Sequence, residues 1–181
     1  RQLPQFLEPE PVGLRHAPVG EAEPCGQLLG HAAAAALGQD GRAGADVGTG
    51  GHAKGQLVAQ LPEPDLEVRV DPSHLHQILW NLCENAFRYA VQTPEDKVEV
   101  RIGRLAGSNR PFLEVLDRGP GIDPAMADRI FEPFFTSRTS GTGLGLFIAR
   151  ELAQCNRALL VFEPRAGGGS VFRVVFADPL R

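Results

Sequence analysis

Gly141-Thr142-Gly143-Leu144-Gly145-Leu146 brings three glycines to the start of a predicted helix that runs from about Leu144 to Cys155. Glycines immediately before a helix expose backbone N–H groups, and the helix dipole favours an anion there. The glycine spacing is not that of a dinucleotide-binding fingerprint, and no lysine follows as it does in a P-loop. The segment therefore predicts a phosphate-binding helix start of another kind.

Three further clusters precede this segment in a fixed order. They are Asn81-Leu82-Cys83-Glu84-Asn85, Asp117-Arg118-Gly119-Pro120-Gly121 and Phe131-Glu132-Pro133-Phe134-Phe135. A single glycine motif is weak evidence, but the whole ordered series is improbable by chance. Together the four clusters indicate a nucleotide pocket that is closed by a mobile segment.

Apolar patterns downstream of Leu57 predict an α/β sandwich. Alternation predicts strands at 66–70 and 98–102, and apolar segments predict two more at 113–116 and 171–176, the last after a tight turn at 167–169. Asp71 and Pro72 suit the N-cap and the first position of a helix. The buried stripe of that helix is expected to be Leu75, Ile78, Leu79, Leu82 and Ala86. Strands on one side and helices on the other indicate a mixed or largely antiparallel sheet with one layer of helices.

Composition limits the classes of function. The 181 residues leave room for one domain, or for one domain and an extension. The formal net charge is -4 and there is no long basic run, so no nucleic-acid partner is expected. Three widely separated cysteines fit neither a disulfide framework nor a metal site, and Cys83 is expected to pack as a small apolar residue. No apolar stretch is long enough to cross a bilayer. We expect a cytoplasmic segment without membrane contact, in a longer protein that an inner-membrane segment upstream could anchor.

Residues 1–55 differ from the rest of the chain, because Ala, Gly and Pro dominate and large apolar residues are scarce. We predict that they form a linker or are poorly ordered, and that residues 56–181 form the folded domain. The change of composition is abrupt. We therefore also hypothesise that much of the first region is an out-of-frame reading of a GC-rich gene, which resequencing of the locus would test.

The asparagines of the first cluster lie one helical turn apart. Asn85 could offer its side-chain oxygen to Mg²⁺, a hard cation, and Arg88 could neutralise phosphate charge. Tyr89 could flank the base or ribose, or simply pack. The alternative for the pair Asn81 and Asn85 is a solvated helix face.

Asp117 follows an apolar strand and precedes a tight turn. Its carboxylate could accept a hydrogen bond from an exocyclic amine such as that of adenine, or could bind the backbone of its own turn. Gly121 would let a purine approach the backbone. The aromatic residues of 131–135 could act as a hinge or latch, or could form a satellite hydrophobic cluster under a loop.

These motifs resemble the ATP-binding catalytic domain of bacterial sensor histidine kinases, in the superfamily shared with gyrase, Hsp90 and MutL. The resemblance covers about residues 57–178 and is nearest to the nitrogen-regulation and pilus-regulation sensor kinases. In the family's terms, 76–90 resembles the asparagine box, and 117–121, 131–135 and 141–146 resemble the first glycine box, the phenylalanine box and the second glycine box. Residues 167–172 resemble the terminal glycine motif, with Ser170 where a threonine near the base is common.

The resemblance implies a Bergerat-type α/β sandwich in which Mg²⁺ and ATP lie in a cleft under a flexible lid. It implies transfer of the γ-phosphate to a histidine on a separate dimerisation and phosphoacceptor domain, with a response regulator downstream. Asn85 would bind Mg²⁺ with Asn81 assisting, and Asp117 would read adenine. The expected ATP-binding residues are Asn81, Asn85, Arg88, Tyr89, Asp117, Gly119, Gly121, Ile122, Thr136, Arg138, Gly141, Thr142, Gly143, Leu144, Gly145, Leu146 and Ser170.

The type of residue at position 81 distinguishes the kinases of this superfamily from its ATP-hydrolysing members. In the hydrolysing relatives a glutamate four residues before the metal-binding asparagine activates water, whereas this chain has Asn81, which is not a base. Glu84 is adjacent to Asn85 and therefore points about 100° away around the helix, so it is a poor substitute.

Three functions remain open at this stage. The first is a kinase module that acts on a histidine in an adjoining or partner domain. No histidine here is followed by the usual phosphoacceptor motif, so the chain is expected to be incomplete alone. The second is a truncated or degenerate, non-catalytic module that binds nucleotide or docks a partner, and the third is a serine kinase of the anti-sigma type.

Overall fold

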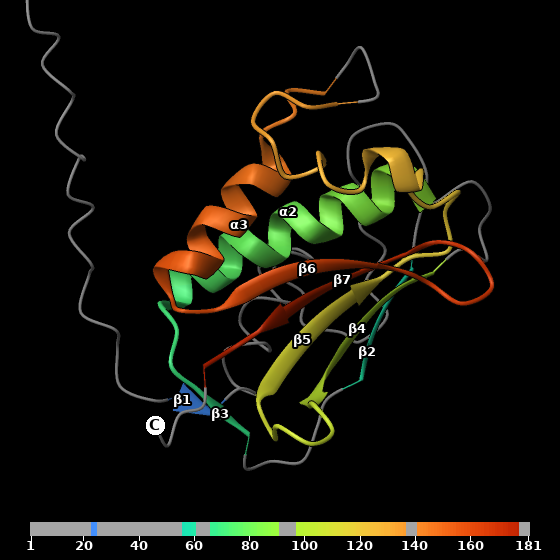
Figure 1. Ribbon diagram of the computed structural model, residues 1–181. Coiled ribbons are helices and arrows are strands. Elements are labelled where there is room, and N and C mark those ends of the chain that lie inside the picture. Colours follow the sequence, from blue (N-terminus) through green and yellow to red (C-terminus); the bar gives the residue numbers. More distant parts are fainter. Residues whose placement is uncertain (1–22, 25–55, 61–65, 91–96, 137–140, 178–181) are drawn as a thin grey trace, which may run out of the picture.

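A five-stranded sheet and two helices make up most of the computed structural model, which describes residues 23–24, 56–60, 66–90, 97–136 and 141–177 (Figure 1). β2 runs parallel to β4, and each other pair of neighbouring strands is antiparallel. The predicted mixed, largely antiparallel sheet is confirmed. In spatial order the strands are β2 (Gln56–Gln60), β4 (Lys97–Arg104), β5 (Pro111–Leu116), β7 (Ser170–Val175) and β6 (Leu159–Pro164).

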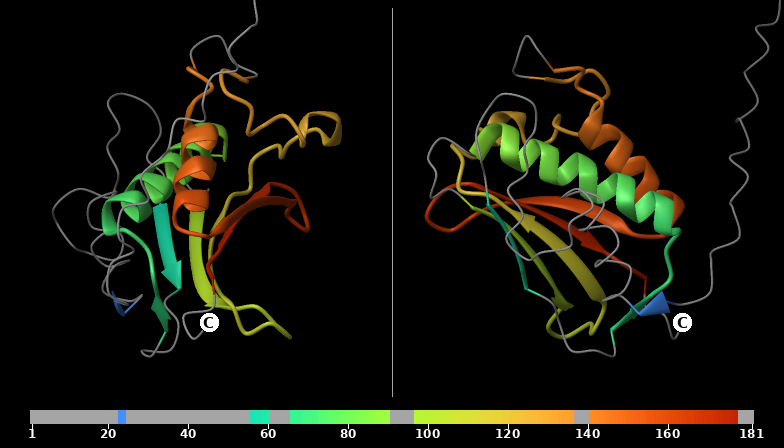
Figure 2. Two further views of the ribbon diagram at one scale, coloured as in Figure 1. Left: turned by 60° about the vertical axis from the view of Figure 1, so that its left-hand side comes forward. Right: turned by 180° about the vertical axis from the view of Figure 1, so that it is seen from behind.

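Helices α2 (Pro72–Ala90) and α3 (Gly145–Cys155) form a single layer over one face of the sheet (Figure 2). They pack side by side, and both contact the strands below them. This arrangement confirms the α/β sandwich with one layer of helices. Neither helix in the described ranges combines the length and the apolar character that crossing a bilayer requires.

The core lies between the helices and the sheet. Along β4 the apolar side chains of Val98, Val100 and Ile102 are buried against the helices, whereas Glu99 and Arg101 alternate onto the opposite face. The predicted stripe of α2 is buried as well, and it comprises Leu75, Ile78, Leu79, Leu82 and Ala86. The alternating apolar side chains of β4 and the apolar stripe of α2 thus pack together in one apolar layer.

The start of α2 has the predicted cap. The Oδ1 atom of Asp71 accepts hydrogen bonds from the backbone N–H groups of Ser73 at 2.8 Å and His74 at 3.1 Å, and Pro72 is the first helical residue. Because Asp71 satisfies two N–H groups that have no partner inside the helix, the helix begins at a defined residue.

Asn156, at the end of α3, ties the two helices together. Its Oδ1 accepts the backbone N–H of Asp71 at 2.8 Å, and its Nδ2 donates to the carbonyl of Leu152 at 2.7 Å. The same Nδ2 lies 3.0 Å from His74 Nδ1. Asn156 is buried, so these bonds satisfy a side chain that would otherwise be costly to bury.

Cys83 packs in the core as predicted. It is buried, and burial raises the pKa of its thiol to about 12. The neutral thiol is therefore the form present near neutral pH, and it behaves as a small apolar side chain.

Some expected elements differ from those observed. The predicted strand at 66–70 is wrong in extent, since only β3 (Glu67–Val68) is extended there, and it pairs with β1 (Glu23–Pro24) rather than with the main sheet. Its apolar residues Leu66, Val68 and Val70 are nevertheless buried in the core. The alternating pattern therefore indicated which side chains are buried, and not that the segment pairs with the main sheet. Two strands of the main sheet, β2 and β6, were not predicted. Apart from Glu23–Pro24, the predictions for residues 1–55 concern residues outside the described ranges.

Candidate functional site

A cleft of about 640 Å³ opens between α2, the start of α3 and one end of the sheet. Its lining comes from α2, from the segment after β5, from the glycine segment before α3 and from β7. Gly119 does not line the cleft, and Arg138 lies outside the described residues. The other predicted ATP-binding residues all line it, namely Asn81, Asn85, Arg88, Tyr89, Asp117, Gly121, Ile122, Thr136, Gly141, Thr142, Gly143, Leu144, Gly145, Leu146 and Ser170.

Other lining residues were not predicted as part of the site. Most are apolar. Four of them, at 84, 120, 135 and 172, stand inside motifs quoted from the sequence, and the other four, at 123, 126, 130 and 148, are marked by no local pattern. These additional residues are Glu84, Pro120, Asp123, Met126, Ile130, Phe135, Ile148 and Phe172.

The two asparagines of α2 face the start of α3. Asn81 is buried with 7% of its surface exposed, so the alternative of a solvated helix face is wrong for this residue. Within the described part of the chain its Nδ2 is buried without a hydrogen-bond partner. A Cβ atom on Gly145 would lie 3.6 Å from Asn81 Oδ1 and 3.9 Å from Asn85 Nδ2. The two carboxamides therefore lie close to the first residue of α3.

The start of α3 opens toward the cleft. Leu144 is its N-cap residue, and its side chain makes no capping hydrogen bond. The first backbone N–H groups of the helix are therefore not capped by the N-cap side chain. Gly143, just before the helix, has φ +67°, and a Cβ atom there would lie 2.5 Å from the carbonyl carbon of Phe134. The predicted glycine-rich helix start is present, and its shape depends on the missing side chain.

Arg88 and Thr136 approach each other across Gly141. A Cβ atom on Gly141 would lie 2.9 Å from Thr136 Oγ1 and 3.9 Å from Arg88 Nη1. Arg88 also forms an ion pair with Glu84, one helical turn earlier. Because Gly141 has no side chain, a hydroxyl and a cation both fit beside it in the lining of the cleft.

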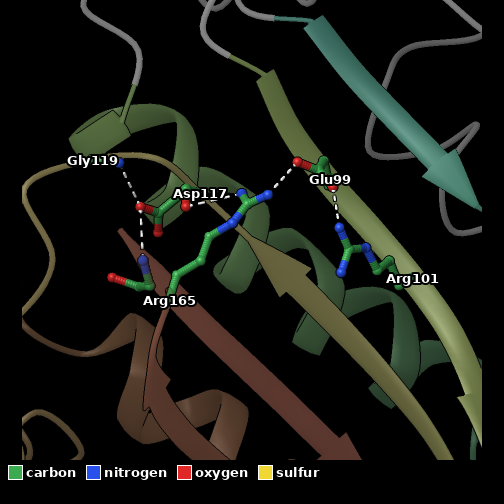
Figure 3. A network of polar contacts seen from close by, with 6 residues as sticks. Glu99, Arg101, Asp117, Gly119 and Arg165 are labelled. Atoms are coloured by element: carbon green, nitrogen blue, oxygen red, sulfur yellow. Dashed lines mark hydrogen bonds and ion pairs between the residues drawn. The ribbon is translucent and has the colours of Figure 1, made fainter. Parts of the chain in front are cut away.

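Asp117 is fixed where β5 ends (Figure 3). Its Oδ1 accepts the N–H of Gly119 at 2.8 Å and the N–H of Ser170 at 3.2 Å. The predicted turn-aspartate geometry is therefore present, and the second bond comes from the neighbouring strand β7. Burial raises the pKa of Asp117 above its usual value, although the hydrogen bonds from Gly119 and Ser170 and the charge of Arg165 oppose this shift.

The aromatic segment divides into packed and exposed residues. Phe131 meets Phe172 edge to face at 6.4 Å between ring centroids, and Phe135 packs against the core under the guanidinium of Arg129. These two residues therefore pack onto the main core and do not form a separate satellite cluster. Phe134 is 73% exposed, has φ +65° and donates its N–H to the carbonyl of Gly143 at 3.0 Å. Its role as a hinge stays a prediction.

Both the sequence and the fold of this domain match those of known proteins. The model of the "Histidine kinase-, DNA gyrase B-, and HSP90-like ATPase" family matches residues 70–180. The chain belongs to this family. It is 42% identical to the sensor protein kinase PilS of Pseudomonas aeruginosa over 125 residues, which are 68% of this chain and 24% of PilS. It is 37% identical to the C4-dicarboxylate transport sensor protein DctS of Rhodobacter capsulatus over 114 residues, which are 62% of this chain and 17% of DctS.

Solved structures of histidine kinases have the same fold as this domain. The nucleotide-free catalytic domain of histidine kinase ThkA aligns with a TM-score of 0.59 and 28% identity over 67% of this chain and 78% of that one. Full-length ShkA in complex with AMPPNP aligns with a TM-score of 0.63 and 25% identity over 88% of this chain and 32% of ShkA. The mycobacterial sensor histidine kinase MprB, at 24% identity and a TM-score of 0.64 over 86% of this chain and 95% of that one, shares the fold.

These matches confirm the predicted resemblance to the ATP-binding catalytic domain of sensor histidine kinases. The domain is of the histidine kinase type found in two-component systems. The chain spans about a quarter or less of the length of PilS and DctS.

Proposed function

We propose that this domain binds ATP with Mg²⁺ in the cleft and donates the γ-phosphate to a histidine on a separate dimerisation and phosphoacceptor domain. The observation that carries the proposal is the start of α3, which opens into the cleft without a side-chain cap beside the buried, unpartnered Nδ2 of Asn81. An unpartnered buried donor costs about 1–3 kcal/mol, and an anionic ligand would supply its missing acceptor.

The phosphates are assigned to the end of the cleft formed by the glycine segment. Backbone N–H groups at Gly143 and Gly145 would hold phosphate oxygens, because the helix dipole favours negative charge there. Arg88 would leave Glu84 and turn toward the phosphates, and the hydroxyl of Thr136 would donate to them. Full-length ShkA was solved with AMPPNP, an ATP analogue, which supports a triphosphate ligand for this type of domain.

The residues fit a magnesium ion that is held mainly by phosphates. No three His, Cys, Asp or Glu side chains gather as a metal site in the ranges that the structure describes. Asn85 is half-buried in the cleft lining and would supply a neutral oxygen ligand, with Asn81 assisting. Mg²⁺ prefers oxygen ligands and, when bound, would neutralise charge on the phosphates.

The adenine is assigned to the end of the cleft at Asp117. Both backbone bonds to this carboxylate end on Oδ1, and the side chain of Ser170 also hydrogen-bonds to the carboxylate. We assign Oδ2, which accepts neither backbone bond, to the exocyclic amine of adenine. Gly121, with φ +77°, and the start of β7 at Ser170 lie beside it. A planar base would pack against Ile122 and Phe172 of the same lining.

The site favours transfer to a protein group over hydrolysis. Asn81 occupies the position where hydrolysing relatives carry a glutamate, and its carboxamide is not a base. Glu84 also lines the cleft, but its carboxylate forms an ion pair with Arg88. The described part of the cleft therefore offers no unpaired carboxylate next to Asn85 for activating water.

A phosphotransfer assay tests the proposal. The chain would be mixed with γ-labelled ATP, Mg²⁺ and the separately produced phosphoacceptor domain of a related sensor kinase. We expect label on that domain that is labile in acid and stable in base, as a phosphohistidine is, and no label when the acceptor histidine is replaced by glutamine. ATP binding without transfer to any tested acceptor domain would favour a non-catalytic nucleotide-binding module, and transfer to serine would favour an anti-sigma type of kinase.

A further inference from the structure

Arg165, in the turn between β6 and β7, connects three strands of the sheet (Figure 3). Its Nη1 donates to the main-chain carbonyl of Asp117 at 3.1 Å, and its Nη2 lies 2.5 Å from Glu99 Oε1 on β4. The Arg165 side chain is 9% exposed. A largely buried guanidinium thus links the residue assigned to adenine with a carboxylate on another strand.

Glu99 is a firm anchor for this guanidinium. Its other oxygen, Oε2, lies 2.6 Å from Arg101 Nη2. Burial alone would raise the pKa of Glu99, but the hydrogen bonds and charges of Arg165 and Arg101 outweigh burial and lower it. The carboxylate is therefore ionised near neutral pH, and its side chain is fixed from two sides.

The turn that carries Arg165 is pressed against the backbone of Asp117. The N–H of Arg165 donates to the carbonyl of Gly169 at 3.1 Å, and the N–H of Gly168 donates to the carbonyl of Arg165 at 3.0 Å. A Cβ atom on Gly169 would lie 2.1 Å from the carbonyl oxygen of Asp117. The carbonyl that Arg165 binds is therefore at the contact between the turn and the end of β5.

Arg173 offers an internal comparison. It is also a partly buried arginine with two carboxylate partners, Glu114 at 2.6 Å and Glu163 at 2.7 Å. These contacts join β7 to β5 and β6, and Arg173 does not line the cleft. The ion pairs of Arg173 thus join neighbouring strands without any contact with Asp117. Arg165 differs from Arg173 because it also binds the main-chain carbonyl of Asp117.

We propose that Arg165 is a positioning residue for adenine recognition. Anchored on Glu99, it holds the main chain of Asp117 and the adjoining glycine turn, so that the Asp117 carboxylate points into the cleft. This inference rests on the proposed function, because it requires that Asp117 reads the base. Arg165 does not line the cleft, and its effect on the nucleotide is transmitted through Asp117.

The test compares ATP with a ribose triphosphate that lacks the base, using calorimetry on the 181-residue chain in Mg²⁺. Arg165→Met should raise the Kd for ATP about tenfold and leave the Kd for the base-free ligand nearly unchanged, because the phosphate end of the cleft is intact. Arg165→Lys keeps the charge but has a single donor nitrogen in place of the two that bind Asp117 and Glu99, so it should recover part of the lost affinity. Glu99→Gln, which removes the negative charge of the anchor and leaves the bond from Arg165 to Asp117, should cost about threefold.

Two control variants make the result decisive. Arg173→Met removes the comparable arginine and should lower thermal stability without changing the ratio of the two Kd values. Asp117→Asn should weaken ATP and spare the base-free ligand. If Asp117→Asn weakens ATP but Arg165→Met does not, the inference is overturned while the proposed function stands. If Arg165→Met weakens both ligands equally, the role of Arg165 is structural and the inference fails. Failure of the wild-type chain to bind ATP overturns both.

Discussion

At Asp117, burial and hydrogen bonding act on one carboxylate in opposite directions. Burial raises its pKa, whereas the N–H groups of Gly119 and Ser170, the side chain of Ser170 and the charge of Arg165 favour the ionised form, and the net shift is upward from 3.8. The ionised side chain is therefore held at a cost in folding free energy. Such a cost is expected where a charged group is kept for binding a ligand.

This upward shift predicts a pH dependence. Between 3.8 and the raised pKa, the native state binds more protons at Asp117 than the unfolded state, so its contribution to stability falls as the pH rises through that window. Asp117→Asn removes the titration and keeps an Oδ1 acceptor. We expect the free energy of unfolding of the variant, relative to wild type, to increase between about pH 4 and about pH 7. Urea denaturation at several pH values measures it, and a difference that is constant or decreases with pH would contradict the assignment.

Asn85 gives a second prediction at this scale. Asn85→Ala removes the proposed oxygen ligand of Mg²⁺, so Mg²⁺ should no longer strengthen ATP binding, and the Kd in Mg²⁺ should rise by at least about tenfold. Calorimetry with and without Mg²⁺ checks this.

Asn156→Ala is the matched control for that variant. It removes a structural asparagine that ties Asp71 to α3, so it should lower the melting temperature and leave the effect of Mg²⁺ intact. Equal strengthening by Mg²⁺ in Asn85→Ala and wild type would refute the metal role of Asn85.

Residues of the cleft could be predicted from the sequence where they belong to a short local motif. Asn85, Asp117 and Gly143 stand in short motifs with a chemical reason for their residue types. Arg165 was not predicted, because its partner Glu99 is 66 residues away and only the folded sheet brings the two together. The burial of Asn81 was also beyond the sequence, since it depends on how α3 packs beside α2.

At the scale of elements, the glycine turn between β6 and β7 packs against the backbone of Asp117, which lines the cleft. Gly167, Gly168 and Gly169 all have positive φ. Gly169 additionally lies in contact with the backbone of Asp117, whereas nothing lies within 4 Å of a Cβ atom placed on Gly167. The turn thus contains one glycine, Gly169, that is required by both conformation and space, and two, Gly167 and Gly168, that are required by conformation alone.

This difference predicts unequal costs within one turn. Gly167→Ala should lower the free energy of unfolding by about 1 kcal/mol, the cost of positive φ for a residue with a Cβ atom. Gly169→Ala should cost a further 1–3 kcal/mol, roughly, because the backbone of Asp117 must move. It should also weaken ATP binding, which Gly167→Ala should spare. Chemical denaturation and calorimetry of both variants provide the check, and equal costs would contradict the close contact.

The helices and strands differ in how well sequence predicts them. The start of α2 was predictable because Asp71 and Pro72 are local signals, and the observed bonds to Ser73 and His74 agree. The strand β6 was not, because its apolar run 159–162 follows a helix closely and its periodicity does not separate strand from helix. Pairing along the whole of β7 determines its conformation.

In the whole molecule, the cleft is assembled from four segments that a single sheet and helix layer bring together. The order of the four sequence clusters at 81–85, 117–121, 131–135 and 141–146 was enough to indicate the family. Their convergence required the antiparallel pairing of β5 with β7, which places Ser170 beside Asp117, and the packing of α3 on α2, which places Gly145 beside Asn81. These long-range contacts depend on tertiary packing, which cannot be predicted from a local sequence pattern.

The most direct test of the account is ATP binding by the wild-type chain, measured by calorimetry with Mg²⁺ and again with excess chelator. The account predicts one binding site per chain, tighter binding in Mg²⁺, and a higher melting temperature when Mg²⁺ and ATP are both present, because a ligand that binds the native state stabilises it. A folded sample that shows no heat of binding and no change in melting temperature would contradict the assignment of this cleft to ATP.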